Sequence, residues 1–318
     1  MRSPLAAETP SPDAAAAAAR RRLLHGIAAG VGAAAIWGVQ AVVSRQSVAE
    51  GLTPADVTVL RFLVAGLILL PVAWRMKPFA VGPLGLKRGL LLALMIGAPY
   101  SMVLVAGAAY APAIHASVIA SGLNPVLATV LGVLVARERP GAVRVVGAAL
   151  IVVGLVLFAW RAFDDGGGRA GAWRGDLLFA TNATIFVIYA RLVTAWRVPA
   201  RAATATICVL SMLMLPLWVW AAPSGFAQAS FGAILWQAVY QGGAVGFGSM
   251  LLFTRAVELI GPVRAAMFVP VMPLTTAVVG ALVLDEWPQA MEWAGMAVVI
   301  AGMALALGGR ARGGATRP

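Results

Sequence analysis

The sequence is short of charge, cysteine and histidine, and each scarcity excludes a class of protein. Only 11% of its 318 residues are charged, against about 25% in a soluble domain, whereas 61% are hydrophobic. A chain this apolar has too little polar surface to cover a water-soluble globule. One cysteine, Cys208, excludes an intrachain disulfide. With only two histidines, His25 and His115, no histidine metal site or Ser-His-Asp triad is supported, and we expect no metal and no cofactor.

Long apolar runs fill most of the chain. Each is long enough to cross the roughly 30 Å hydrocarbon core of a bilayer as a helix. The sequence therefore predicts an all-α membrane protein with the lipid bilayer as a partner. The ten predicted spans are 23–44, 57–74, 89–110, 115–136, 142–160, 175–195, 203–222, 233–253, 262–284 and 289–308.

The positive charge is distributed as in a multi-pass membrane protein, not as in a nucleic-acid-binding protein. The formal net charge is +12. If the N-terminus is cytoplasmic, 19 of the 24 lysines and arginines fall in cytoplasmic segments. This asymmetry follows the positive-inside rule. It predicts a protein of the cell inner membrane with both termini in the cytoplasm and no nucleic-acid partner.

The chain contains an internal sequence repeat of two copies. Shifting the sequence by 148 positions aligns Pro125 with Pro273, Glu138 with Glu286 and Pro140 with Pro288, and 12 of the 33 positions 125–157 are identical. The spaced Pro, Glu and Gly matches are harder to obtain by chance than the apolar ones. The predicted parts are a disordered cytoplasmic tail (1–22), a first repeat (23–160), a linker (161–174), a second repeat (175–308) and a C-terminal tail (309–318).

Each repeat holds five predicted spans, so the second repeat enters the membrane from the opposite side. Inverted repeats of this kind are shared by many secondary transporters, whose substrate site lies near the midplane between the halves. The sequence thus predicts ten transmembrane helices as two inverted five-helix repeats, and a transporter that works by alternating access.

Several segments resemble a known family. They are "AIWGVQAVVSR" in the first span, "VLRFLVAGLILL" in the second, and the repeated "NP…ERP…G…G" and "MP…DEWP…G…G" stretches. Together they resemble the drug/metabolite transporter superfamily, in particular transporters with two EamA domains. The resemblance implies ten helices, cytoplasmic termini and transport, often export, of amino acids, nucleobases or other small metabolites.

Polar residues within predicted spans are candidates for the substrate site, because a charge at the bilayer centre costs about 2.5–3.5 kcal/mol on the insertion scale. Arg61 could bind a carboxylate or phosphate, or extend outward to the membrane surface. Trp37 lies deep in the first span and could form an aromatic wall with Gln40 beside it, or simply pack between helices. Glu258 is predicted to pair with Arg255 at the membrane edge, with a proton-coupling role as the alternative. The further candidates are Tyr100, Asn124, Asn182, Tyr240 and Gln241.

Two prolines mark predicted helix breaks. A mid-helix proline frees the carbonyl four residues earlier, which is that of Ser121 for Pro125 and that of Val269 for Pro273. Broken backbone at membrane depth is tolerated where protein or a watery cavity satisfies it. Equivalent breaks in both repeats point to a site between them, and a tolerated kink is the alternative.

The charged turn "VARERPGAVRVVG" at 135–147 has a counterpart, "VLDEWPQAMEWAG" at 283–295. Inverted topology places Glu138 and Glu286 on opposite faces, too far apart for one central site. We expect both turns to be structural, with Pro140 and Pro288 in the first turn of the next helix and each glutamate favouring that helix's N-terminus.

Four functions are compatible with such a chain. The preferred one is a secondary transporter that exports a small polar metabolite such as an amino acid, with a homodimer left open. Multidrug-cation efflux ranks lower because residues 23–44 contain no Asp or Glu. An integral membrane enzyme is disfavoured because it should carry clustered His, Asp or Glu, which are scarce here. A sensor is disfavoured because it should carry a soluble domain, whereas the predicted loops are short. Substrate, direction and energy coupling are not encoded in a recognisable motif.

Overall fold

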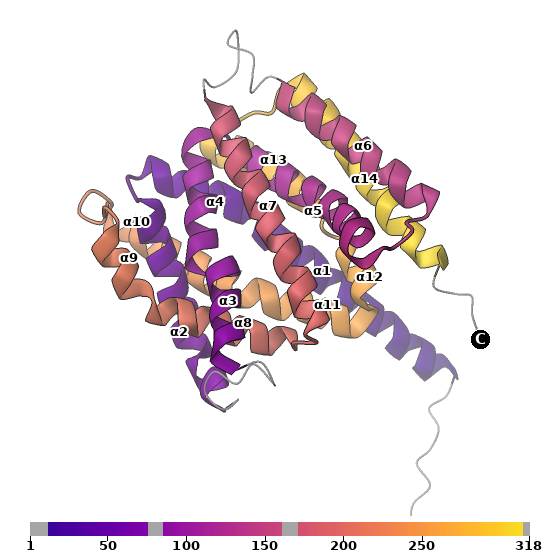
Figure 1. The fold of residues 1–318 in the computed structure, drawn as a ribbon, viewed down its shortest axis with the longest axis horizontal. Helices are drawn as coiled ribbons and strands as arrows, with labels where there is room; N and C mark the ends of the chain where they lie inside the picture. Colours follow the sequence, from indigo (N-terminus) through magenta and orange to yellow (C-terminus); the bar gives the residue numbers. More distant parts are fainter. Residues whose placement is uncertain (1–11, 76–84, 161–170, 314–318) are drawn as a thin grey trace, which may run out of the picture.

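The structure, a computed structural model, describes residues 12–75, 85–160 and 171–313, and the regular elements in these ranges are helices. The first half contains α1 (Pro12–Ala49), α2 (Pro54–Arg75), α3 (Gly85–Ile96), α4 (Ala98–Tyr110), α5 (Ala113–Ala136) and α6 (Ala142–Ala159). The second half contains α7 (Ala172–Ala195), α8 (Ala200–Leu213), α9 (Leu215–Ala221), α10 (Phe231–Gln237), η3 (Ala238–Gly248), α11 (Ser249–Ile260), α12 (Pro262–Ala266), α13 (Val271–Leu284) and α14 (Ala290–Gly313). Figure 1 shows them as one bundle.

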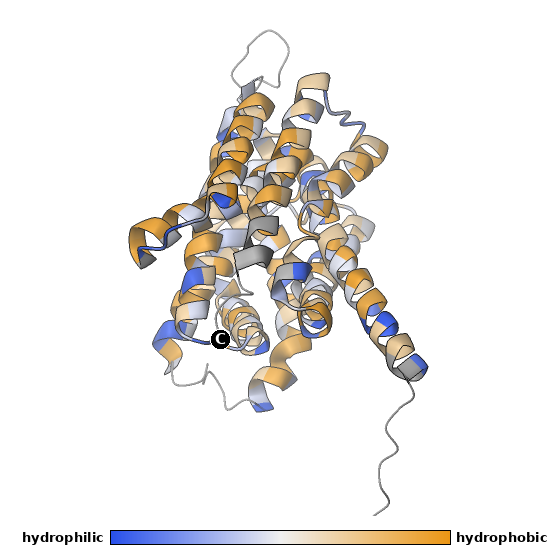
Figure 2. Ribbon diagram, turned by 90° about the vertical axis from the view of Figure 1, so that its right-hand side faces the viewer, coloured by the Kyte–Doolittle hydropathy of each residue, from blue (hydrophilic) through white to orange (hydrophobic). Residues whose placement is uncertain are grey.

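The bundle contains the ten predicted spans. Within the described ranges, nine helical stretches are long and apolar enough to cross a membrane, and the pair α8–α9, bent by 43°, supplies a tenth when counted as one span. Large apolar side chains such as Leu134, Trp220 and Leu282 are exposed on the outside of the bundle. Figure 2 shows hydrophobic residues running along the outer helices. Such a surface suits lipid rather than water.

Four glycines relate the two halves. Helices α6 and α14 lie side by side (Figure 1), and a Cβ at Gly147 or Gly302 would press on the backbone of the other. Gly154 and Gly295 meet in the same way. The sequence repeat makes Gly147 equivalent to Gly295 and Gly154 equivalent to Gly302. The two contacts therefore exchange under the repeat operation, as contacts across a two-fold axis do, and a pseudo-two-fold axis passes between α6 and α14.

The charged turns also repeat in backbone detail. Arg137 and Asp285, one repeat apart, both adopt the left-handed conformation, with φ values of 52° and 54°. The next N–H groups, of Glu138 and Glu286, donate to the carbonyls of Gly132 and Gly280 at 3.0 and 3.2 Å. Each half thus ends this helix with the same wide turn, closed by an N–H that reaches the carbonyl six residues earlier. Pro140 and Pro288 lie two residues before α6 and α14 begin, so the prediction that they lie in the first helical turn is wrong. An extended N-cap, Gly141 in the first half, intervenes.

The two prolines predicted to break helices behave differently from each other. Helix α5 continues through Pro125, so the predicted break is absent there. In the second half the chain leaves the helix at 267–270, and Pro273 lies in the first turn of α13. The carbonyl of Val269 accepts the N–H of Met272 at 3.0 Å, so it is satisfied locally. The difference arises because Pro270 adds a second missing donor, whereas its repeat counterpart is Gly122.

Element ends differ from the predicted domain boundaries in two places. Helix α1 begins at Pro12, inside the segment 1–22 predicted as a disordered tail, because the alanine run at 14–19 has high helix propensity. Helix α7 begins at Ala172, before the predicted end of the linker. Most of the predicted linker and the end of the C-terminal tail lie outside the described residues.

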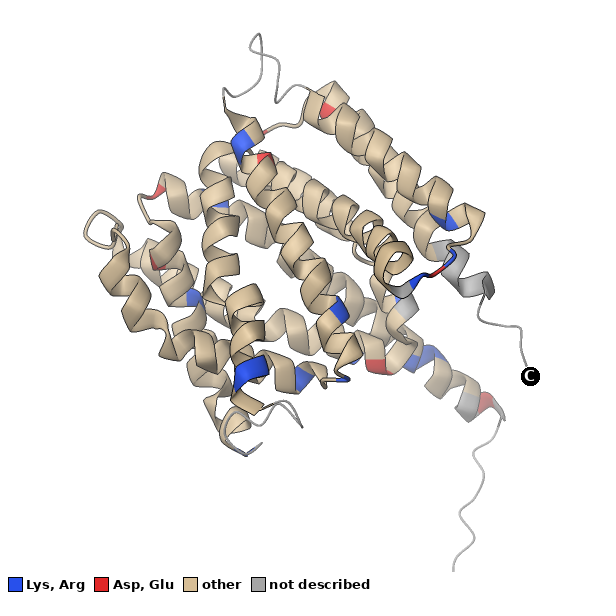
Figure 3. Ribbon diagram, viewed as in Figure 1, with Lys and Arg blue, Asp and Glu red and all other residues tan. Residues whose placement is uncertain are grey.

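Charge separates the two ends of the bundle, which we name after the repeated glutamates. The Glu138 face holds the start of α1 and the α5–α6 turn, and the Glu286 face holds the α13–α14 turn. Figure 3 shows most of the Lys and Arg at the Glu138 face. In the described part of the chain, only Arg45, Arg61 and Arg174 lie in the half nearer Glu286.

Candidate functional site

Arg61 anchors the first group of predicted site residues. It lies seven residues after the start of α2, about 10 Å into the span. Its side chain is buried, with 8% of the residue exposed, and its Nη1 donates to Ser101 Oγ of α4 at 3.3 Å. The described residues offer it no carboxylate within ion-pair distance. A buried guanidinium without a counter-charge is costly, which makes Arg61 a candidate for ligand binding.

Asn182 lies beside this group. From α7 its Nδ2 donates to the carbonyl of Tyr100, the residue before Ser101, at 3.2 Å. Its Oδ1 is buried and has no hydrogen-bond partner within the described chain. The helix that carries Tyr100 starts just after a break at Gly97, where the span of α3 and α4 is interrupted. The predicted residues Arg61, Tyr100 and Asn182 are thus brought together at an interrupted helix.

The second group lies where the end of α10 and the π-helix η3 pack on α1. Gln237 and Gln241 are fully buried. Gln237 Nε2 donates to the carbonyl of Val43 at 2.9 Å, and Gln241 Nε2 donates to Ser44 Oγ at 3.0 Å. Both Oε1 atoms are buried without a partner in the described ranges. Tyr240 likewise donates to a backbone carbonyl of α1 at 2.9 Å. π-helical turns are frequent at functional sites.

The first two groups are neighbours. A Cβ at Gly242, the residue after Gln241, would lie 3.1 Å from the carbonyl oxygen of Arg61 and would clash with Val64. Gly242 and Gly246, whose added Cβ would meet Val64 and Ala65, therefore allow η3 to pack closely on α2. Gln237 and Ser101 were not among the predicted residues. A glutamine one helical turn before Gln241 is the sequence signal that could have identified Gln237.

Trp37 follows Ile36, whose carbonyl accepts the Tyr240 hydroxyl at 2.9 Å, but its own side chain contacts α11. Its Nε1 donates to Ser249 Oγ of α11 at 3.0 Å. The next residue, Gly38, contacts α13, where Thr276 Oγ1 donates to its carbonyl at 2.8 Å. Gln40 is buried. These contacts explain the "WG" pair by helix packing, so a role of Trp37 and Gln40 in substrate binding stays a prediction.

Asn124 is half-buried on α5, and its Oδ1 is buried without a partner among the described residues. An orphaned amide oxygen next to Pro125 suits a ligand contact, but no described contact joins Asn124 to Arg61 or Gln241. The predicted residues therefore fall into separate groups, two of which are adjacent.

Glu286 does more than complete a turn. Its Oε1 accepts Arg45 Nε of α1 at 3.0 Å, and its Oε2 accepts the N–H of Ala113, the first residue of α5, at 2.9 Å. Arg45 also donates from Nη1 to the carbonyl of Ala108, near the end of α4, at 2.9 Å. Its carboxylate therefore caps α5, and its predicted effect on the N-terminus of the next helix, α14, stays a prediction. Glu292 caps α14, accepting the N–H of Gln289 at 2.7 Å.

Glu138 makes the corresponding pairs at the opposite face. Arg191 of α7 approaches its Oε1 at 3.3 Å, and Arg144 of α6 approaches its Oε2 at 3.5 Å. Arg45 and Arg191 both lie near the ends of the first helices of their repeats. The pairs Glu286–Arg45 and Glu138–Arg191 each join one repeat to the other. The side chain of Glu138 is 43% exposed, however, against 20% for Glu286. Glu258 pairs with Arg255 at 3.0 Å, as predicted.

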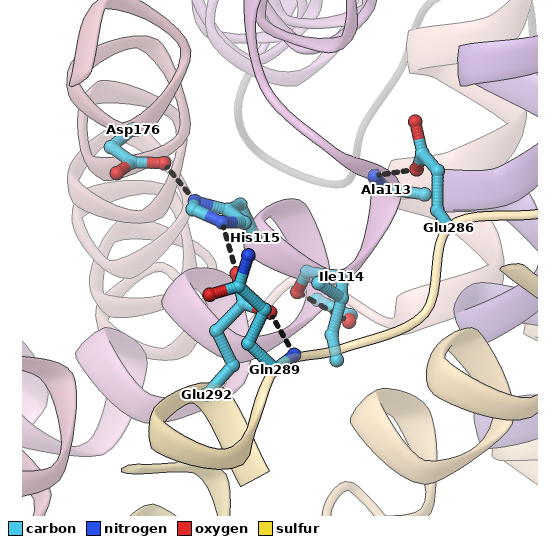
Figure 4. Close-up of polar contacts among 8 residues, drawn as sticks. Ala113, Ile114, His115, Asp176, Glu286, Gln289 and Glu292 are labelled. Atoms are coloured by element: carbon cyan, nitrogen blue, oxygen red, sulfur yellow. Dashed lines mark hydrogen bonds and ion pairs between the residues drawn. The ribbon is translucent and has the colours of Figure 1, made fainter. Parts of the chain in front are cut away.

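A further cluster, centred on His115, lies at the Glu286 face. The sequence pattern predicts no function for His115. His115 of α5 contacts Asp176 of α7 and Glu292 of α14, which lie 61 and 177 residues further along the chain (Figure 4). The sequence signal that could have found them is that all three lie near the starts of predicted spans entering from the same face. No group of His, Cys, Asp and Glu suited to a metal ion occurs in the part of the chain that is described.

Comparison with known proteins identifies the family. A sequence profile described as the EamA-like transporter family matches residues 24–160 and 173–308. The chain belongs to the EamA-like transporter family. The two matches correspond closely to the predicted repeats 23–160 and 175–308, so this EamA-like transporter carries two copies of the family's unit, consistent with the drug/metabolite transporter superfamily.

Solved structures support the fold of the EamA-like transporter. One, titled only as the crystal structure of a protein, superposes with a TM-score of 0.62 at 19% identity, covering 93% of this chain and 100% of its own. At this identity the likeness concerns the fold alone. A search of curated proteins finds no match for the chain.

Proposed function

We propose that this EamA-like transporter is a secondary transporter that exports a small polar metabolite, such as an amino acid, by alternating access. The observation that carries the proposal is the pseudo-two-fold axis between α6 and α14, defined by the exchanged contacts Gly147–Gly302 and Gly154–Gly295. Two halves inserted in opposite directions can exchange conformations and so expose one site to each side in turn.

We propose that the Glu286 face is external. Lysines and arginines are concentrated at the Glu138 face (Figure 3), and cytoplasmic loops of membrane proteins carry such an excess. Both ends of the described chain are at the Glu138 face, so both termini are cytoplasmic in this orientation. The membrane is then the cell inner membrane.

The two charge pairs support a conformation closed at the outside. Glu286 with Arg45 ties together α1, the end of α4 and the start of α5, and both side chains are at most 20% exposed. The equivalent pair at the inside, Glu138 with Arg191, is about 40% exposed on each side chain. Transport then requires the Glu286 pair to separate while its counterpart becomes enclosed.

Arg61 is the proposed receptor for a carboxylate on the substrate. Its guanidinium is buried, and its one described hydrogen bond goes to a neutral hydroxyl, so donors are left for an anionic group. Asn182 Oδ1 and Gln241 Oε1, both buried acceptors without described partners, would receive N–H or O–H groups of the same substrate. An anion that also carries donors, as an amino acid does, fits this set. A lipophilic cation does not complement Arg61, which argues against multidrug-cation efflux.

The experiment begins with the metabolites that leave or accumulate in cells with and without the protein. The compounds so identified are then tested for transport into proteoliposomes by the wild type, Arg61→Gln and Arg61→Lys. We expect Arg61→Gln to lower the initial rate at least about tenfold, because hydrogen bonds to a charged group are lost, and Arg61→Lys to retain part of it. Arg255→Gln, in an exposed pair at the Glu138 face, is the matched control.

An unchanged rate in Arg61→Gln, with a carboxylate-bearing substrate, would remove Arg61 from the site. A compound that is chemically altered rather than moved would indicate an enzyme instead of a transporter.

A further inference from the structure

His115 lies between two carboxylates that come from different helices (Figure 4). Its Nδ1 is 2.7 Å from Asp176 Oδ1, and its Nε2 is 3.3 Å from Glu292 Oε1. The residue is 4% exposed, and the ring of Phe158 on α6 packs against the imidazole edge-on with 4.7 Å between ring centres. The contacts join α5 of the first repeat to α7 and α14 of the second.

The geometry fixes how many protons the cluster must hold. A neutral imidazole has one N–H and one lone pair, whereas an imidazolium has two N–H groups. Because both ring nitrogens face carboxylate oxygens, a neutral ring between two ionised carboxylates would set a lone pair against an oxygen at one contact. Both contacts are favourable only when the three groups share one further proton and carry a net charge of −1 instead of −2.

Charged residues near the cluster on neighbouring elements have contacts of their own. On α7, Arg174 stacks on the neighbouring Trp173. On α1, Arg45 is engaged by Glu286, which binds the N–H of Ala113 two residues before His115. Glu292 also accepts the N–H of Gln289. Asp285, the remaining acidic residue of the adjoining turn, accepts the indole N–H of Trp287. A protonated His115 places one positive charge within hydrogen-bond distance of both Asp176 and Glu292.

We propose that His115, Asp176 and Glu292 form a proton-binding site that keeps the Glu286 face closed. With the proton bound, the ring on α5 of the first repeat donates to two helices of the second repeat at once. Without it, one contact is lost and two carboxylates remain beside a neutral ring in a buried setting, so the helices at this face separate more easily. The site makes opening of this face depend on pH. This inference rests on the proposed function only in that opening of the face is a step of transport.

The test follows hydrogen–deuterium exchange of the intact protein in nanodiscs by mass spectrometry, across about pH 5 to pH 10. It reads the amide groups at the starts of α5 and α7, and His115→Gln is compared with the wild type at each pH. Comparison at equal pH removes the chemical dependence of exchange on pH. No substrate is needed, so the result does not depend on whether the protein transports the proposed metabolite.

We expect wild-type protection of these amides to fall about tenfold as pH rises and the proton is lost, after correction for chemical exchange. His115→Gln should show weak protection at every pH, because glutamine cannot bind the proton. Glu292→Gln, whose side chain is less buried, should lower protection as well and covers the case in which His115→Gln does not fold. Glu258→Gln, at the opposite face, should behave as the wild type.

The proposal is overturned if wild-type protection at the start of α5 is the same at low and high pH. It is equally overturned if His115→Gln, or Glu292→Gln in its place, keeps the full pH-dependent change. Peptides from the end of α5, residues 126–136, provide the internal reference and should show no such difference between the variants and the wild type.

Discussion

The turns at Glu138 and Glu286 share one sequence pattern and one backbone geometry but differ in surroundings. Both follow a left-handed residue, and both glutamates pair with an arginine from the first helix of the other repeat. Glu286 also holds the N-terminus of α5 and is mostly enclosed, whereas the side chain of Glu138 is about twice as exposed. When an inverted-repeat transporter is closed at one face only, its equivalent residues are expected to lie in unequal surroundings.

The largest expected effect comes from removing the enclosed glutamate. Glu286→Ala leaves Arg45 buried without its counter-charge and removes the acceptor for Ala113 N–H, so we expect the free energy of unfolding to fall by about 3 kcal/mol. Glu138→Ala breaks an exposed pair and should lower it by no more than about 1 kcal/mol. The measurement is the unfolding midpoint of each variant in mixed micelles titrated with a denaturing detergent. Equal losses in the two variants would show that the two turns are not in different environments.

A smaller effect, equal in both halves, is expected at the pseudo-two-fold axis. Gly154→Ala would place a Cβ 2.8 Å from the carbonyl oxygen of Gly295, and Gly302→Ala would place one 2.8 Å from that of Gly147. Each should cost about 2 kcal/mol by overpacking, and the two losses should agree within about 0.5 kcal/mol. Gly232→Ala, whose nearest contact would be at 3.9 Å, is the matched control in the same unfolding assay. Clearly unequal losses at Gly154 and Gly302 would contradict the axis.

The sequence was informative where the structure depends on local pattern. The length of the apolar runs predicted the spans, and the spacing of Pro, Glu and Gly predicted the repeat. Both patterns can be recognised because each lies within a continuous segment of the sequence. The glycines that define the axis were visible as part of that spacing, although their mutual contact was not.

The contacts between helices could not be read in the same way. Glu286 precedes α14 in sequence but caps α5, because the fold brings Ala113 to its carboxylate from 173 residues away. His115 looked isolated for the same reason. Trp37 is a candidate because of its depth, whereas its indole N–H is explained by the position of Ser249 on another helix. Pro125 and Pro273 looked equivalent until the effect of Pro270 was included.

The inverted arrangement of the two repeats is the central claim, and one labelling experiment tests it most directly. Arg139 and Trp287 are repeat counterparts, both exposed, in the two turns compared above. Each is replaced by cysteine in a Cys208→Ala background and treated in intact cells with a membrane-impermeant thiol reagent. The account predicts that Trp287→Cys reacts from outside, whereas Arg139→Cys reacts only after the membrane is opened. Reaction of both from the same side would contradict it.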